Sequence, residues 1–200
     1  MKQSINRFLA LSGVLILLNS ASYPELIESV NRNVPKNEIE GKDILEIGSR
    51  DINGSVRWIF ESKGCKSYLG TDIIPGKSVD TLINVYELDK HFKKQSFDIV
   101  ICLETLEHLE YWDSAIYQMD QVLKRGGLMI VAAPRVGFPR HDWPGDYWRY
   151  EIEDWRKIFV DYDEYYADNV RETGTLYIAR KKHKMQVDLK TIYLHKVKSP

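Results

Sequence analysis

The first segment with the residue types of a ligand-binding loop begins at Gly48, which directly follows an apolar run. The run 43–47 is followed by Gly48, a polar stretch and then Gly54, where the next helix is predicted to begin. Glycine lets the backbone approach a ligand closely, and the free N–H groups of a helix start attract an anion. Five residues separate Gly48 from Gly54, and Arg50 is one of them. This spacing does not fit G-x-G-x-x-G, so NAD binding is disfavoured.

A carboxylate, Asp72, ends the second apolar run, 24 residues after Gly48. In α/β sheets that bind nucleosides, an acid about 20 residues after the first glycine accepts hydrogen bonds from the ribose hydroxyls. The alternative is a solvent-facing turn acid ahead of Pro75-Gly76. The position of the upstream glycine loop favours the ribose interpretation.

Acids and a histidine follow the apolar run 97–103. Glu104 is nearest the end of this run, where its carboxylate could face a cofactor or a substrate. For His108, which comes directly after Glu107, we favour bracing of the following helix over proton transfer.

The stretch 135–150 is dense in aromatic residues, arginine and proline. Aromatic faces beside charged side chains can bind a sugar, a base or a peptide side chain, and His141, Asp146 or Tyr147 could accept a proton. An equally balanced alternative is a rigid packed lid with an ion pair between Asp146 and Arg149.

The elements that must position these residues alternate between strand and helix. Short apolar runs bounded by turn residues predict strands, and amphipathic stretches predict helices. We expect strands over 43–47, 67–72, 79–84, 97–103, 128–133, 164–170 and 175–179, and helices over 23–33, 56–63, 114–124 and 152–160. Asp113 is predicted to cap the third helix and Gly126-Gly127 to end it. The fold class is therefore α/β, a doubly wound, mostly parallel sheet with a terminal antiparallel hairpin.

The size and composition of the chain fit one soluble domain. It has 200 residues, 44% of them hydrophobic and 28% charged, with a net charge of −1. We expect N-terminal helices over 1–40, the main domain over 41–180, and a basic strand or tail over 181–200. Because the chain as a whole has a net charge of −1, nucleic acid is a disfavoured partner, and the basic C-terminal segment is the one feature that leaves it open.

The N-terminal segment and the two cysteines indicate the cellular compartment in which the protein is expected to fold. The apolar run 8–18 resembles a signal peptide but is too short to span a bilayer, and we expect it to be retained as a helix in a cytoplasmic protein. Neither Cys65 nor Cys102 has a partner at metal-ligand spacing, so no metal is expected. The sequence does not indicate the oligomeric state.

Several of these motifs occur together in one family. Glu46-x-Gly48, the acid Asp72, the run 97–103 leading into Glu107-His108, and the stretch 122–127 before a strand resemble the class I S-adenosylmethionine-dependent methyltransferases. The similarity covers about 42–179. It implies a Rossmann-like methyltransferase fold of seven strands in the order 3-2-1-4-5-7-6, with the seventh strand antiparallel, and S-adenosylmethionine as cofactor.

The resemblance also implies roles for particular residues. The 46–54 loop would meet the methionine part of the cofactor, Asp72 the ribose, and the segment after the third strand the adenine. The cofactor-binding candidates are Glu46, Gly48, Ser49, Arg50, Asn53, Gly54, Asp72, Ile73, Asn84, Val85, Leu103 and Glu104; the catalytic candidates are His141, Asp146, Tyr147 and His108. Arg50 and Ile52 stand where the family commonly has glycines, and Asn84 where it often has an acid.

The predicted function is methyl transfer to an O or N nucleophile of a small-molecule or saccharide-like acceptor. One alternative is a module that binds S-adenosylmethionine without catalysis, suggested by the degenerate glycine loop. A P-loop over 70–78 is a weaker alternative, because five residues separate its glycines where four are needed, and one of these is Pro75, which has no N–H.

Overall fold

The structure is a computed structural model that describes residues 23–141, 145–170 and 173–197. A seven-stranded sheet has the order β3-β2-β1-β4-β5-β8-β7, and β8 is antiparallel to both of its neighbours. The strands are β1 (Asp43–Ile47), β2 (Ser67–Asp72), β3 (Thr81–Leu82), β4 (Phe97–Leu103), β5 (Leu123–Pro134), β7 (Tyr162–Val170) and β8 (Gly174–Lys181). The predicted fold class, strand order and terminal hairpin are confirmed.

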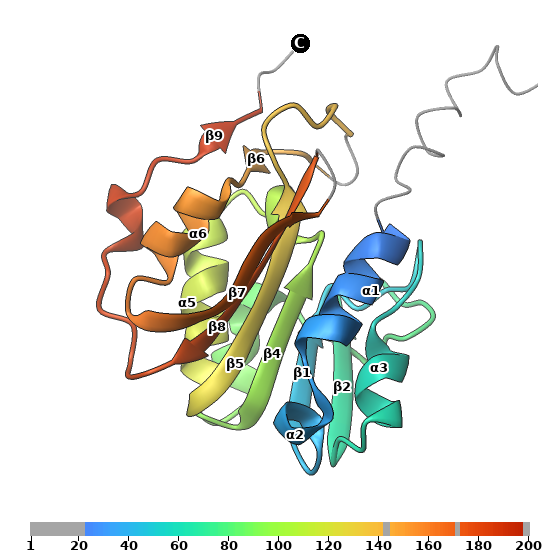
Figure 1. The fold of residues 1–200 in the computed structure, drawn as a ribbon. Coiled ribbons are helices and arrows are strands. Elements are labelled where there is room, and N and C mark those ends of the chain that lie inside the picture. Colours follow the sequence, from blue (N-terminus) through green and yellow to red (C-terminus); the bar gives the residue numbers. More distant parts are fainter. Residues whose placement is uncertain (1–22, 142–144, 171–172, 198–200) are drawn as a thin grey trace, which may run out of the picture.

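Helices cover both faces of the sheet, as a doubly wound fold requires (Figure 1). One face packs against α1 (Tyr23–Asn33), α2 (Lys36–Ile39) and α3 (Arg57–Ser62). The other packs against α4 (Leu88–His91), α5 (Trp112–Val122) and α6 (Ile152–Ile158). Because β4 lies between two covered faces, nearly all of its side chains are buried, which explains its continuous apolar sequence.

The end of α5 differs from the prediction. The helix runs from Trp112 to Val122, so Asp113 lies inside its first turn, and its N-cap is Tyr111 with no side-chain cap bond. Leu123 is already extended, and β5 begins there by pairing with Phe97. Gly126 therefore does not end a helix; its positive φ of 77° lies in the β4–β5 region where the register shifts.

The C-terminal segment turns back onto the domain. Its strand β9 (His195–Lys196) pairs with β6 (Trp148–Arg149), which follows the 135–147 loop. The short 3-10 helices are η2 (Val85–Glu87), η3 (Leu106–His108) and η4 (Leu189–Thr191). The boundaries predicted at residues 40 and 180 stay a prediction. The predicted N-terminal helix over 8–18 lies outside the described residues, and within these no helix is long and apolar enough to cross a membrane.

Candidate active site

The carboxyl ends of β1, β2, β4 and β5 lie at one edge of the sheet, with the 135–147 loop beside them (Figure 1). In open α/β sheets this edge is where ligands bind. Most of the sequence candidates lie at or just after the ends of these strands, whereas Asn84 and Val85 follow β3. The topology therefore brings together residues that are about 100 positions apart in the chain.

Gly48 follows β1 with a φ of 70°, a conformation that favours glycine. A Cβ atom at this position would lie 2.0 Å from Oγ1 of Thr105. Close approach of a ligand to this glycine stays a prediction. The structure adds a second reason for glycine here, since the space beside the Cα is filled by the Thr105 side chain.

The loop after β1 is anchored to the segment after β2. Ser49 Oγ donates to the backbone oxygen of Ser78 at 3.0 Å, and the Asp51 N–H donates to that of Lys77, also at 3.0 Å. The side chains of Asp51 and Lys77 form an ion pair at 2.6 Å. Gly54 donates its N–H to Oδ1 of Asp51. These contacts fix the path of a loop whose sequence is rich in polar residues.

Asp72 joins the two loops. Its Oδ1 accepts a hydrogen bond from the Ile74 N–H at 2.9 Å, and its Oδ2 accepts a longer one from the Arg50 N–H at 3.4 Å. The carboxylate is half-buried, and the neighbouring Ile73 is 58% exposed. An anchored carboxylate beside an exposed apolar side chain is therefore present at the end of β2.

The other cofactor candidates have mixed environments. Leu103 and Val85 are buried in the core, and Asn53 is exposed. Asn84 caps η2, because its side-chain oxygen accepts from the Tyr86 N–H. The cap uses the side-chain oxygen of Asn84, so the amide nitrogen is the group of this side chain that the cap does not use.

Glu46 is a buried carboxyl group on β1, only 3% exposed. Tyr68 donates a hydrogen bond to its Oε2 at 2.7 Å. Burial raises the pKa of Glu46 to about 7, and the Tyr68 hydrogen bond offsets only part of this effect. The group therefore changes charge close to neutral pH.

The raised pKa of Glu46 predicts a pH-dependent stability. Because the pKa is higher in the folded protein, proton binding by Glu46 favours the folded state. This contribution to the free energy of unfolding is fully present below pH 4.5 and is lost as the pH rises to about 7. The loss should be roughly 3 kcal/mol in the free energy of unfolding. Urea unfolding from pH 5 to 8 should show a smaller decline for Glu46→Gln than for the wild type. Parallel curves for the two proteins would contradict the assignment.

Two further acids follow β4. Glu104 has a positive φ of 49°, which is strained for a residue with a side chain, and its N–H donates to the Ala132 oxygen. Glu107 lies on η3 and is fully buried. Burial raises the pKa of Glu104, and the nearby Glu107 adds to the effect; burial likewise raises the pKa of Glu107.

The 135–150 loop is held by a buried ion pair. Arg149 donates to Asp146 through two nitrogens, at 2.5 and 2.7 Å, and both side chains are almost fully buried. Burial raises the pKa of Asp146, but hydrogen bonds from Arg149 and the His141 N–H outweigh this and hold it below its usual value. The ion pair of the packed-lid alternative is thus present, and Asp146 is a poor proton acceptor.

Contacts with η3 place the loop over the site. Tyr147 donates its N–H to the backbone oxygen of Glu107 at 2.8 Å, and Nδ1 of His108 contacts the backbone oxygen of Gly145. His108 therefore braces this loop rather than the following helix, which corrects the expectation from sequence.

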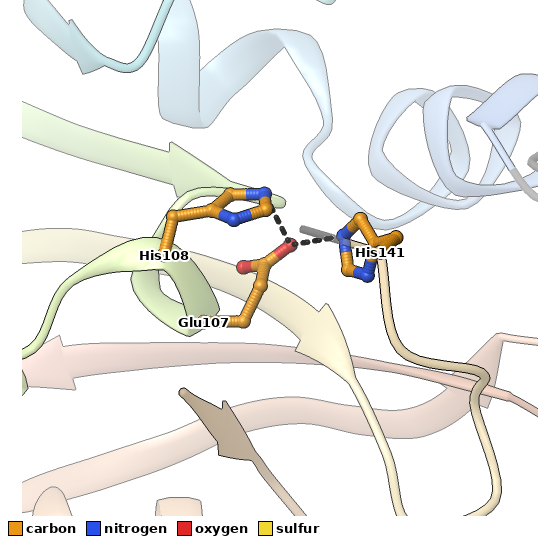
Figure 2. Close-up of side chains that lie close together, drawn as sticks. All are labelled: Glu107, His108 and His141. Atoms are coloured by element: carbon orange, nitrogen blue, oxygen red, sulfur yellow. Dashed lines mark ion pairs between the residues drawn. The ribbon is translucent and has the colours of Figure 1, made fainter. Parts of the chain in front are cut away.

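Figure 2 shows His108 and His141 converging on the carboxylate of Glu107. Nε2 of His108 lies 3.6 Å and Nε2 of His141 3.9 Å from Oε1 of Glu107. The two imidazole rings are 4.9 Å apart and nearly perpendicular. Burial lowers the pKa of His141, so its ring is neutral at pH 7. The cluster thus combines two imidazole rings, that of His141 neutral, with a buried carboxyl group.

Sequence reasoning missed three residues that shape this site: Glu107, Thr105 and Arg149. Glu107 was passed over as a site residue in favour of its neighbour His108, although an acid next to a histidine after a strand is a usable signal. Arg149 was placed in the aromatic stretch, both beside the acceptor and as the partner of Asp146 in a packed lid, but was not named as a site residue. No local pattern indicates that Thr105 fills the space beside Gly48.

The profile of the methyltransferase domain family matches residues 19–174. A search of curated protein sequences gives no match. Among solved structures, the chain is similar to 1,6-didemethyltoxoflavin-N1-methyltransferase from Burkholderia thailandensis, with a TM-score of 0.62 and 12% identity over 85% of this chain and 88% of that one. That structure holds S-adenosylhomocysteine.

Two further structures have the same fold. An S-adenosylmethionine-dependent methyltransferase from Mesorhizobium loti has a TM-score of 0.58 and 13% identity, over 77% of this chain and 96% of that one. The magnesium protoporphyrin IX methyltransferase of Synechocystis has a TM-score of 0.61 and 16% identity, over 81% and 84% of the two chains. With a family match over most of its length and this fold, the chain belongs to the methyltransferase domain family.

Proposed function

We propose that the protein transfers the methyl group of S-adenosylmethionine to an O or N nucleophile of a small-molecule or saccharide-like acceptor. The family match and the carboxylates at the ends of β1, β2 and β4 support the proposal. The observation that carries it is the anchored Asp72 carboxylate, which faces the same edge as the loop after β1.

The chemistry of the side chains at this edge fits the cofactor. S-adenosylmethionine supplies a methyl group on a positively charged sulfonium, beside an ammonium group, a ribose and an adenine. Asp72 is an acid that suits the ribose hydroxyls, and Glu104, whose pKa is raised by burial and by Glu107, would ionise more readily beside a bound positive charge. Ile73, 58% exposed, offers an apolar surface for a base.

Each part of the edge has a proposed role. Asp72 would accept hydrogen bonds from the ribose hydroxyls through the lone pairs that its two backbone contacts leave free. The loop from Glu46 to Gly54 would line the methionine part, and the segment at Asn84 and Val85 the adenine. Because β1 and β2 hold these groups on rigid strands, the protein's main task is to align the reactants and exclude water.

The acceptor is proposed to bind beneath the 135–150 loop. Phe138 and Tyr147 are partly exposed there beside His141. The neutral His141 ring and Nε2 of His108 are the groups available to activate a hydroxyl or amine, whereas Asp146 is occupied by Arg149. A cytoplasmic location, where this methyl donor is made, stays a prediction.

Asp72→Ala should weaken S-adenosylhomocysteine binding about 10- to 100-fold, because it removes hydrogen bonds to a charged group worth about 1.5 to 3 kcal/mol. Calorimetric titration measures this affinity directly. Asp163→Ala is the matched control, since Asp163 is an exposed acid on β7 that pairs with Lys182. Equal affinity in the wild type and Asp72→Ala would show that this acid does not contact the cofactor.

Two alternatives give different results in the same assays. A binding module without catalysis would bind S-adenosylhomocysteine yet leave a screen of hydroxyl and amine acceptors unmethylated. A P-loop protein would be stabilised by ATP with Mg²⁺ but not by the methyl donor. Stabilisation by S-adenosylmethionine together with methylation of an acceptor supports the proposed function over both.

A further inference from the structure

Glu107 is a buried carboxyl group whose oxygens accept no hydrogen bond from the described residues, although the rings of His108 and His141 lie near it. Its side chain has no solvent exposure, and neither of its oxygens has a hydrogen-bond partner among the described residues. An unpaired polar group in this position costs free energy, and an unpaired charge costs more. Such a residue in a folded protein calls for a ligand that satisfies it.

The two histidines present free nitrogens to this carboxyl group. Nδ1 of His108 contacts the Gly145 carbonyl, so it carries the proton and leaves the Nε2 lone pair directed at Glu107 (Figure 2). On His141, Nδ1 lies 3.2 Å from Oδ2 of Asp146, and Nε2 again faces Glu107. Asp146 also accepts the backbone N–H of His141 at 2.8 Å, which fixes the position of this residue.

The distances between the Glu107 oxygen and the two histidine nitrogens are closer to those between ligands of one metal ion than to hydrogen-bonded ion pairs. The 3.6 and 3.9 Å separations from Glu107 exceed the length of a hydrogen bond. Ligand atoms about 2.0 to 2.1 Å from a tetrahedral ion lie about 3.4 Å apart. One ligand atom from each of the three residues lies within 4.8 Å of the others. Small side-chain rotations would therefore bring all three onto one ion.

We propose that Glu107, His108 and His141 bind a divalent transition-metal ion of the zinc type, with one coordination position left open. Two imidazoles and one carboxylate are a ligand set that such ions prefer, and catalytic sites of this kind keep a position for water or substrate. The Gly145 carbonyl acts as the outer partner of the His108 ring, and Asp146 fixes the backbone of His141, whose Nδ1 has no hydrogen-bond partner among the described residues. His141 is 34% exposed, which gives the ion a path to the site.

The ion would have a role in the proposed methyl transfer, and this part of the inference rests on the proposed function. The open position of such an ion would be available to an acceptor bound in the region proposed above. An acceptor hydroxyl bound there loses its proton more readily, because a metal ion lowers the pKa of a bound O–H group. His108 and His141 are then ligands that position the acceptor, and the proton leaves to solvent.

The test uses untagged full-length protein dialysed against a chelator. Titration with ZnCl₂ alone should give one ion per chain, and cobalt(II) should give the visible absorption of a four-coordinate site. Titration with S-adenosylhomocysteine, without metal, is a separate arm. Zinc binding with no cofactor binding would support the metal site while refuting the proposed function; the reverse would refute only the metal site.

Substitutions locate the site. Glu107→Gln keeps the side-chain size, and His141→Ala alters a partly exposed ring, so each is expected to fold, which circular dichroism can verify. Each should weaken zinc binding by about 100-fold or more, since the loss of even an outer partner typically costs about 10- to 100-fold. His183→Ala is the matched control, because His183 is exposed and lies outside the cluster.

Two results would overturn the proposal. One is the absence of stoichiometric zinc binding to the wild-type protein. The other is zinc affinity that is unchanged in both Glu107→Gln and His141→Ala but falls in His183→Ala, which would show adventitious binding at surface histidines only.

Discussion

Arg149→Met is expected to lower the free energy of unfolding by about 3 to 5 kcal/mol. Arg149 and Asp146 are both almost fully buried, and two hydrogen bonds connect them. Arg149 also donates to the backbone oxygens of Phe138 and Pro139. Removing the guanidinium leaves the Asp146 charge buried without its partner. This destabilises the fold more than replacing both members of the pair by apolar side chains.

Urea unfolding of wild type, Arg149→Met and the double variant Asp146→Leu/Arg149→Met would measure this effect. The double variant should recover part of the loss, because no isolated charge remains. Arg156→Met is the control, since Arg156 forms ion pairs with Glu153 and Glu164 on the exposed surface. That variant should change stability by no more than about 1 kcal/mol. Comparable losses in Arg149→Met and Arg156→Met would mean that the buried pair has no special weight.

The sheet was predictable because its central strands are apolar on both faces. The run 97–103 and the short run 43–47 have no other way to be buried than between two layers of helices. The position of α5's end was not predictable from local pattern. Gly126-Gly127 resembles a helix stop, yet Leu123 already pairs with Phe97 on β4, so the tertiary contact outweighs the local signal.

The placement of Gly48 and Asp72 at one edge of the sheet was predictable from the sequence, whereas the cluster of Glu107, His108 and His141 was not. Asp72 and Gly48 lie where strand ends place them, so their spacing along the chain is informative. His141 lies 3.9 Å from Glu107, Asp146 accepts the His141 N–H and pairs with Arg149, and the Tyr147 N–H binds the backbone oxygen of Glu107. This arrangement depends on contacts between distant residues, and no residue spacing encodes it.

Gly48→Ala is expected to lower the free energy of unfolding by about 2 to 5 kcal/mol. A left-handed conformation costs a residue with a Cβ atom about 1 to 2 kcal/mol, and overpacking adds about 1 to 3 kcal/mol. Both contributions apply, since φ is 70° and the new Cβ would lie 2.0 Å from Thr105 Oγ1. Thr105 sits between Leu103, whose oxygen accepts from its hydroxyl, and the start of η3.

The double variant Gly48→Ala/Thr105→Gly separates the two contributions. The Thr105→Gly change removes the side chain that the new Cβ meets. Adding Gly48→Ala to Thr105→Gly should therefore lower the free energy of unfolding by less than adding Gly48→Ala to the wild type does. The backbone strain alone would then remain, at about 1 to 2 kcal/mol. Because Thr105 connects the loop after β1 to the Glu107 cluster, S-adenosylhomocysteine affinity should fall together with stability. A Gly48→Ala protein as stable as the wild type would mean that Thr105 moves aside at no cost, and that this glycine is there for the ligand after all.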